Sequence, residues 1–221
     1  MKKVVISLGG SIVVPDKVNY SYLKNFKKLI TNFSKRNKVV IVVGGGSTAR
    51  KYMKKKFDNT TNSRLGITAT RLNARLVNGI FNKKEPIPIR LTEVKKELKS
   101  KNIVVCGALG YKKSCTTDGN AAQVAKKIKA EYLINMTNVK GLYDKNPKTN
   151  KSAKLIKKIS FKDFLKMINK IKFQAGQHFV LDQFAAKLIA RKKIKTYIIG
   201  PSLVNLKKVL SNKKFIGTTI S

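Results

Sequence analysis

Short, nearly continuous runs of valine, isoleucine and leucine are the feature that most restricts the fold of this chain. Val4–Leu8 is interrupted by a single serine, and Val39–Val43 is entirely aliphatic. Strands with one solvated face alternate apolar and polar residues, whereas strands covered on both faces form unbroken apolar runs. Similar runs follow at Ile87–Leu91, Ile103–Cys106, Tyr132–Met136 and Ile194–Ile199. The runs predict a sheet that is buried between two layers of helices.

Stretches with helical spacing separate these runs. Apolar residues recur at intervals of three and four within Leu23–Phe33 and Phe161–Ile168, and Ser160 can cap the second of these helices. Alternation of strands and helices is typical of an α/β fold, here a three-layer αβα sandwich with a mostly parallel central sheet. Right-handed crossovers would place the loops that follow the strands at one edge, where ligands bind. We expect residues 1–221 to form one such domain.

The charge of the chain is extreme, with 49 Lys+Arg against 10 Asp+Glu and a formal net charge of +39. Lysine far outnumbers arginine, and the lysines are scattered in pairs such as Lys83-Lys84 and Lys192-Lys193. Surfaces that read bases favour arginine and concentrate it on one face. The sequence therefore predicts nucleic-acid binding of a non-specific, salt-sensitive kind only.

The lengths of the apolar runs and the spacing of the two cysteines indicate the cellular location. No apolar run reaches the length of a membrane span, and the N-terminal run is too short for the core of a signal peptide. Cys106 and Cys115 have no metal-type spacing and suggest free thiols in a reducing compartment. We expect a cytoplasmic protein without a membrane partner.

Two glycine clusters follow the first two runs directly. Gly9 and Gly10 precede Ser11, and Gly44-Gly45-Gly46 precedes a helix expected to start near Thr48. Glycine lets backbone N–H groups approach an anion, and a helix N-terminus adds free donors and a positive dipole. Each cluster alone is compatible with a tight turn, but two after adjacent strands predict a polyphosphate track. The Walker and G-x-G-x-x-G patterns are absent, which argues against the classical nucleotide folds.

Two later segments carry polar residues at the ends of predicted elements. Thr116 or Thr117 can cap a helix and hold a phosphate, although an ordinary capped helix explains the same residues equally well. Segment Thr137–Pro147 follows the run that ends at Met136, and its Thr, Asn and Tyr side chains can frame a base and a ribose. Taken alone, this segment is better explained as a turn-rich loop, and only the other three segments favour a binding role.

Taken together, these segments resemble the amino acid kinase family, and within it the archaeal-type uridylate kinases. The matching segments run in order over essentially the entire chain: Gly9-Gly10-Ser11, Gly44-Gly45-Gly46, Ala49-Arg50-Lys51, Leu65–Ala74, Thr116-Thr117-Asp118, Thr137-Asn138-Val139, Gly141, Tyr143, Asp182–Lys187 and Gly217–Ile220. The resemblance implies the αβα fold, ATP carried with Mg²⁺, uridine monophosphate (UMP) as the acceptor, and a homohexamer that is a trimer of dimers. It also implies that the part up to about residue 120 binds the acceptor and that the remainder binds ATP.

The resemblance implies two sets of binding residues. The ATP-binding set is Gly9, Gly10, Ser11, Gly45, Arg50, Thr137, Asn138, Tyr143 and Asn146. The UMP-binding set is Gly44, Ser63, Arg71, Leu109, Ser114, Cys115, Thr116 and Thr117. No dedicated protein metal site is expected beyond the Mg²⁺ that accompanies ATP.

Asp118, Asp182 and Lys187 are the candidates for catalysis. The two carboxylates lie in the matching segments, where they can orient a lysine or hold the magnesium shell, although Asp182 is equally well explained as a helix N-cap. The acceptor is already an anionic phosphate, so in-line transfer requires positioning and charge neutralisation and no general base. His178 is accordingly interpreted as structural.

The sequence departs from the family pattern at several places. Ser7 stands where a lysine often lies two residues before the first glycine, so Lys187 or Lys51 would supply that cation. The loop at residues 111–115 is about two residues longer than usual, and an acidic residue near Ser63 is replaced. These departures leave two alternatives open: a related phosphotransferase acting on isopentenyl phosphate or an acidic amino acid, and a non-catalytic nucleic-acid or regulatory binding protein that keeps the fold.

Overall fold

A single seven-stranded sheet organises the molecule. The structure, a computed structural model, describes residues 1–53, 57–110, 116–147, 149–170 and 181–221. The strand order is β3-β2-β1-β4-β6-β7-β5, and the neighbouring strands pair in parallel except for β6 and β7. The strands are β1 (Lys3–Leu8), β2 (Lys38–Val43), β3 (Ile103–Cys106), β4 (Tyr132–Met136), β5 (Lys158–Ile159), β6 (Thr196–Ile199) and β7 (Thr218–Ile220).

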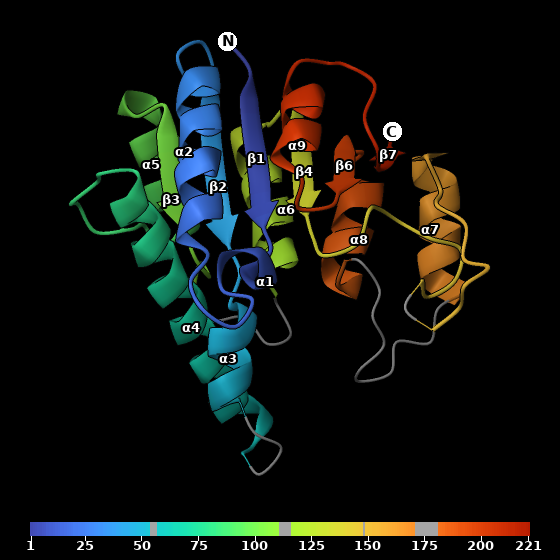
Figure 1. The fold of residues 1–221 in the computed structure, drawn as a ribbon, viewed down its shortest axis with the longest axis horizontal. Helices are drawn as coiled ribbons and strands as arrows, with labels where there is room; N and C mark the ends of the chain where they lie inside the picture. The colour runs from blue at the N-terminus through green and yellow to red at the C-terminus, as the bar shows by residue number, and fades with distance from the viewer. Residues whose placement is uncertain (54–56, 111–115, 148, 171–180) are drawn as a thin grey trace.

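Helices cover both faces of the sheet, which confirms the predicted three-layer αβα architecture (Figure 1). One face packs against α1 (Gly10–Val13), α2 (Tyr20–Ser34), α4 (Asn59–Ile80) and α9 (Leu203–Leu210), and α3 (Gly46–Tyr52) packs on α4. The other face packs against α5 (Leu91–Ser100), α6 (Thr117–Ile128), α7 (Phe161–Lys170) and α8 (Gln183–Arg191). The apolar runs therefore have both of their faces in a hydrophobic core.

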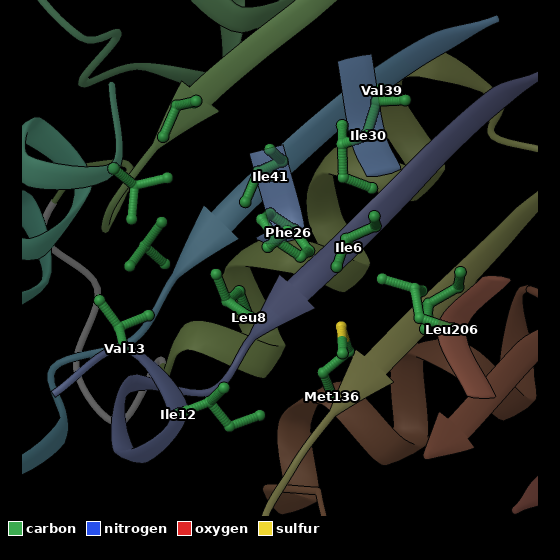
Figure 2. Close-up of a cluster of buried hydrophobic side chains, with 14 of the residues drawn as sticks. Ile6, Leu8, Ile12, Val13, Phe26, Ile30, Val39, Ile41, Met136 and Leu206 are labelled. Atoms are coloured by element: carbon green, nitrogen blue, oxygen red, sulfur yellow. The ribbon is translucent and has the colours of Figure 1, made fainter. Parts of the chain in front are cut away.

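The core between α2 and the sheet shows why the helical spacing predicted a helix here (Figure 2). Phe26 and Ile30 lie one turn apart on α2, point at the sheet beside Ile6 and Ile41, and are fully buried. Leu206 closes the same cluster from α9. Burying one such side chain contributes about 1.5–3 kcal/mol, so this layer holds β1 and β2 firmly in place.

β1 lies at the point where the strand order reverses. The chain proceeds from β1 to β2 and β3 on one side of it, and β4 and β6 lie on the other side. The carboxyl ends of β1 and β2 run into α1 and α3, as Figure 1 shows. In open α/β sheets, ligands bind outside the carboxyl ends of the strands at such a reversal. The fold therefore places both glycine clusters where a ligand is expected.

One predicted strand is wrong, and two short strands were missed. Residues 87–89 form no strand, and Leu91 begins α5. Pro86 and Pro88 remove two backbone donors from this run, so it cannot complete a ladder of hydrogen bonds. The last predicted strand begins at Thr196, two residues later than expected, and α3 begins at Gly46, two residues earlier than Thr48. β5 and β7 are too short to give a periodic signal in the sequence.

Among the described residues, no helix has both the length and the apolar composition that crossing a membrane requires.

Candidate active site

The two glycine clusters pack directly on each other at the carboxyl ends of β1 and β2. The Gly44 N–H donates to Leu8 O at 3.0 Å, and the Gly9 N–H donates to Met136 O at 3.0 Å, which ties the first cluster to β4. A Cβ atom on Gly10 would lie 2.1 Å from Gly46 N and 2.5 Å from Gly44 C. Only glycine allows this approach, and Gly46 also has a left-handed φ of 60°. We call the contact of Gly9–Gly10 with Gly44–Gly46 the glycine junction.

A buried asparagine holds the second glycine cluster in place. Asn73 lies on α4, is 3% exposed, and donates from Nδ2 to the carbonyls of Gly44 and Gly45, each at 2.8 Å. Its Oδ1 accepts from Thr48 Oγ1 at 3.3 Å. Both carbonyls are thereby held by α4, which fixes the orientation of the peptide units at the junction. Asn73 was not predicted to have this role, because a contact between segments about 28 residues apart is visible only in the fold.

A cavity of about 300 Å³ opens beside the glycine junction. Its walls come from the second glycine cluster, α3, α4, the segment after β3 and the start of α6. The lining residues are Gly45, Gly46, Ala49, Met53, Ser63, Gly66, Ile67, Thr70, Ala108, Thr116 and Thr117. It therefore gathers three of the predicted acceptor residues, Ser63, Thr116 and Thr117, with Gly45 from the predicted ATP set. Its volume lies at the lower end of the range for small-ligand sites.

Two carboxylates are hydrogen-bonded to two hydroxyl groups next to Thr116, which lines this cavity. Ser7 Oγ donates to Asp118 Oδ1 at 2.8 Å, and Thr116 Oγ1 donates to Asp182. Thr116 is also the N-cap of α6, and its hydroxyl accepts from the Asp118 N–H at 3.2 Å. The structure thus brings Asp118 and Asp182, predicted as catalytic, together with the acceptor residue Thr116. The prediction that Thr116 or Thr117 caps a helix is confirmed for Thr116.

Burial raises the pKa of the Asp118 carboxyl to about 7. The hydrogen bond from Ser7 lowers this pKa, and the neighbouring charge of Asp182 raises it. Ser7 is 1% exposed and stands where the resembling family often has a lysine. A lysine would pair with the carboxylate, whereas serine only hydrogen-bonds to it. The link between Ser7 and Asp118 joins residues 111 positions apart and was not predicted.

Asp182 has the structural role that the sequence left open. Its Oδ1 accepts from the Ala185 N–H at 2.9 Å, so it is the N-cap of α8. Its other oxygen accepts a hydrogen bond from the Thr116 hydroxyl, and this bond links α8 to α6. One carboxylate therefore serves as a cap and still faces the site. Lys187 lies one turn further along α8 and is half-buried.

The predicted ATP-side residues lie at the carboxyl ends of β1 and β4. The Thr137 N–H donates to Ile199 O at 3.0 Å, and Thr137 Oγ1 donates to Asn138 Oδ1 at 3.4 Å. Tyr143 forms an isolated bridge with Leu155, and Asn146 is half-buried in the loop that follows. Gly9, Gly10 and Ser11 start α1 at the neighbouring strand end. These segments leave β1 and β4 side by side, which is the arrangement that a nucleotide spanning both would need.

Three further predicted residues have partners within this chain, and two of them are arginines directed at backbone carbonyls. The Arg50 guanidinium lies 3.5 Å from Pro15 O and is exposed, and Arg71 Nε donates to Ala108 O at 3.2 Å. The Leu109 N–H donates to Asn120 Oδ1 at 3.0 Å. Both arginines reach across segments that border the cavity, and neither lines it. Ser114, Cys115 and His178 lie outside the described residues.

The two carboxylates fit a magnesium ion that arrives with a nucleotide. Mg²⁺ in phosphoryl-transfer sites is usually held by one or two carboxylates together with substrate phosphates and water. Asp118 and Asp182 provide that number, and they lie close enough for the charge of Asp182 to raise the pKa of the Asp118 carboxyl. The described part of the chain contains no group of three or more His, Cys, Asp or Glu side chains that could hold a metal by itself. The donor set thus suits a substrate-borne cation and does not form a dedicated metal cage.

Comparisons with known proteins agree with this geometry. The family model described as the amino acid kinase family matches residues 2–200. A uridylate kinase from Archaeoglobus fulgidus is 36% identical over 99% of this chain and 100% of its own length, and one from Pyrococcus abyssi is 37% identical over 90% of each. The crystal structure of the Archaeoglobus fulgidus enzyme superposes with a TM-score of 0.87 and covers both chains completely.

Proposed function

The chain belongs to the amino acid kinase family, and we propose that it transfers the γ-phosphoryl group of ATP to UMP, giving UDP and ADP. The observation that carries the proposal is the glycine junction, which joins the ends of β1 and β2 beside a cavity of about 300 Å³. The full-length similarity to uridylate kinases identifies the class of acceptor. The reaction is a step of pyrimidine nucleotide synthesis.

In the proposed arrangement, the acceptor occupies the cavity and ATP spans the ends of β1 and β4. Gly44, Ser63, Arg71, Leu109, Thr116 and Thr117 would surround UMP, together with Ser114 and Cys115 of the neighbouring segment. Gly9, Gly10, Ser11, Gly45, Arg50, Thr137, Asn138, Tyr143 and Asn146 would hold ATP. The proposed acceptor residues all lie before about residue 120, whereas the proposed ATP residues come both from that part and from the remainder of the chain. The two phosphates meet at the glycine junction, where backbone N–H groups can approach both.

Phosphoryl transfer at this site depends on positioning and charge neutralisation. The phosphate oxygen of UMP is already a nucleophile, so no residue has to remove a proton. Backbone N–H groups at the start of α1 and the cap of α6 would face developing negative charge. Asp118 and Asp182 would orient the coordination shell of the Mg²⁺ that accompanies ATP. Lys187, on α8 behind Asp182, would supply the cation that the family often places at the position of Ser7.

The proposal extends to assembly and location. We infer a cytoplasmic homohexamer built as a trimer of dimers, as the family resemblance suggests. Leu72 on α4 is 57% exposed although it is a large apolar residue, and an interface between subunits would cover it. Analytical ultracentrifugation tests this part separately from activity.

A coupled ADP-release assay tests the central proposal. ATP and Mg²⁺ are supplied with UMP, CMP, dUMP, AMP or acetylglutamate as the acceptor. Turnover restricted to UMP, or strongest with it, is the expected result. Strong turnover with a different acceptor would keep the phosphotransferase assignment and refute the choice of UMP. Absence of turnover with every acceptor, in protein shown to be folded, would support a binding protein that keeps the fold.

A further inference from the structure

The amino ends of the strands, opposite the candidate active site, carry a cluster of lysines that the proposed kinase reaction does not use. A cavity of about 400 Å³ lies there, between the starts of β1 and β2 and the ends of α5 and α6. Its lining residues are Lys3, Lys38, Lys95, Leu98, Lys99, Lys127, Ile128 and Lys129. No carboxylate is among them. We call this cavity the lysine pocket.

The lysines are brought together by the fold and come from separate parts of the sequence. Lys3 and Lys38 are register partners at the first positions of β1 and β2, so the parallel pairing sets them side by side. Lys95 and Lys99 lie one turn apart on α5, and Lys127 lies in the last turn of α6. Leu98 and Ile128 are buried beneath them and fix the two helices in position. The charges are thus presented by a rigid frame.

Of the six ammonium groups, that of Lys38 has hydrogen-bond partners among the described residues. Lys38 Nζ donates to the carbonyls of Leu98, and of Lys99 at 2.8 Å, at the end of α5. The carboxyl ends of α5 and α6 add some partial negative charge. Among the described residues, no ion pair involves any lysine of the pocket. Five ammonium groups therefore share the pocket without a carboxylate.

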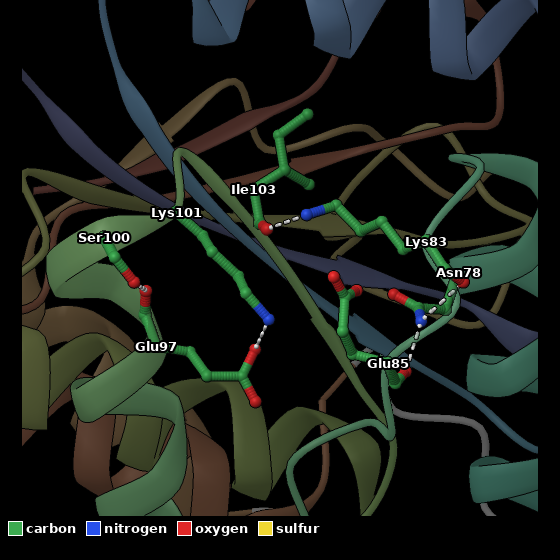
Figure 3. A network of polar contacts seen from close by, with 7 residues as sticks. All are labelled: Asn78, Lys83, Glu85, Glu97, Ser100, Lys101 and Ile103. Carbon is green, nitrogen blue, oxygen red and sulfur yellow. Dashed lines mark hydrogen bonds and ion pairs between the residues drawn. The ribbon is translucent and has the colours of Figure 1, made fainter.

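Two acidic side chains close in sequence to the pocket lysines form ion pairs with lysines outside the pocket. Glu97 lies on α5 between Lys95 and Lys99 but pairs with Lys101 at 3.0 Å. Glu131 pairs with Lys2 at 2.7 Å, beside the start of β4. Figure 3 shows the first of these pairs in its network at the start of β3. There Lys83 donates to Ile103 O at 2.9 Å, so Lys83 and Lys101 both have partners, whereas within the described parts of the chain Lys38 is the one lysine of the pocket that does.

We propose that the lysine pocket is a binding site for a small anion that carries two or more phosphate groups. Lysine is a common phosphate ligand because it acts as a compact, strongly donating point charge. One phosphate dianion would leave most of the five ammonium groups uncompensated, whereas a polyphosphate neutralises several of them at once. The volume falls within the range of small-ligand sites. The site is separate from the candidate active site, because the two lie at opposite ends of the same strands.

A nucleic acid is the less suitable ligand on the same observations. Lysines from four elements line one open depression, whereas a strand of RNA is followed by charges along a groove and by exposed aromatic rings on which bases stack. No aromatic residue lines the lysine pocket. A small polyanion matches both the converging charges and the limited volume.

Isothermal titration calorimetry with tripolyphosphate, orthophosphate and a uridine oligonucleotide tests the proposal at a fixed, physiological ionic strength. The pocket variant is Lys95→Gln/Lys99→Gln/Lys127→Gln. The matched control is Lys28→Gln/Lys162→Gln/Lys208→Gln, which removes the same charge from exposed positions on α2, α7 and α9. Neither variant changes the active site. Lys28 lines a second cavity with Lys24 and Lys27, so the single variants Lys162→Gln and Lys208→Gln are measured as well to separate the two cavities. Thermal unfolding confirms that both variants are folded.

The expected result is a dissociation constant for tripolyphosphate about tenfold higher in the pocket variant, with little change in the control. Orthophosphate should bind all three proteins weakly. Equal losses in the two variants would overturn the proposal, because general charge would then explain binding. Orthophosphate binding as tight as that of tripolyphosphate would refute a polyphosphate site. A loss confined to the oligonucleotide would replace the small anion with a nucleic acid.

Discussion

The two ends of the central sheet are built for different purposes, although they belong to the same strands. At the carboxyl ends, backbone meets backbone: Gly10 leaves no room for a Cβ atom against Gly44 and Gly46, and Asn73 fixes the carbonyls behind them. At the amino ends, lysine side chains that include those of Lys3 and Lys38 line a cavity and supply its charge. The first arrangement depends on sub-ångström geometry, and the second depends on charge.

This difference predicts how each end responds to substitution. A close backbone contact fails when one atom is added, because nothing nearby can move away. Removing one of several exposed charges lowers stability or binding only slightly, because water and salt screen each charge. We therefore expect single substitutions to have large effects at the carboxyl ends and small effects at the amino ends.

Gly10→Ala should produce the largest effect. Its Cβ atom would lie 2.1 Å from Gly46 N, and backbone atoms cannot yield as a flexible side chain can. We expect loss of measurable kinase activity and destabilisation of about 3 kcal/mol or more, measured by urea unfolding. Gly79→Ala on α4 is the control, because no atom lies within 4 Å of its added Cβ. That variant should keep full activity and gain about 0.5 kcal/mol from better helix propensity.

The Gly79→Ala control isolates the effect of the close contact at Gly10. Both substitutions add the same methyl group to a glycine, so they differ only in the space around it. Normal activity in Gly10→Ala would show that the glycine junction adjusts, and the contrast between the two ends of the sheet would then fail.

Asp118→Asn should raise the stability of the protein at high pH while lowering its activity. The pKa of Asp118 is raised to about 7, so the folded protein holds this proton more tightly than the unfolded chain does. Its ionisation therefore costs stability as the pH rises from about 4 to about 7, and no cost remains below that window. The Asn variant should match the parent near pH 4 and be more stable at pH 8, by on the order of 2 kcal/mol.

The activity of the Asp118→Asn variant is expected to fall although its stability at pH 8 rises. The Asn variant should lose most of its turnover, because the proposed carboxylate partner of Mg²⁺ is gone, although it is the more stable protein at pH 8. Urea unfolding at the two pH values, with kcat measured at pH 8, checks both halves. An Asn variant that is less stable than the parent at pH 8 would contradict the raised pKa.

Thr116→Val should have a moderate effect at the same end of the sheet. The hydroxyl caps α6 and donates to Asp182, so its loss should cost about 1 kcal/mol and raise KM for UMP. Ser202→Ala is the matched control, since Ser202 caps α9 by accepting from the Asn205 N–H at 3.3 Å. The control should lose similar stability and keep its kinetics unchanged. Equal kinetic losses in both variants would indicate a purely structural role for Thr116.

The sequence was sufficient to predict the sheet because each buried strand has its own apolar run. Five of the six predicted runs became strands, and the sixth failed for a reason visible in the sequence, since Pro86 and Pro88 remove its donors. β5 and β7 could not be found, because two or three residues give no period. Their pairing is decided by the position of neighbouring elements.

The candidate site was predictable only where its parts are local. The glycine clusters and the cap at Thr116 are short patterns, and the structure has both of them at strand or helix ends. The contacts between distant segments were not predictable. Ser7 reaches Asp118, Asn73 holds Gly44, and Met53 and Thr70 line the cavity, and each of these contacts requires the folded chain. The lysine pocket was missed for the same reason, because its lysines look scattered in the sequence.

Lys101→Gln should give the smallest effect and tests the amino ends directly. Lys101 and Glu97 form an ion pair at 3.0 Å on a partly exposed surface, where such a pair contributes about 0.5 kcal/mol. The loss should shrink further in high salt, and kcat/KM should not change. Glu97 would then be free to turn toward Lys95 and Lys99, so tripolyphosphate should bind slightly more weakly. Urea unfolding at two salt concentrations, together with calorimetry, checks both effects. A loss of several kcal/mol in the free energy of unfolding, or a fall in kcat/KM, would mean that the amino ends are as sensitive to substitution as the glycine junction. The distinction between the two ends of the sheet would then not hold.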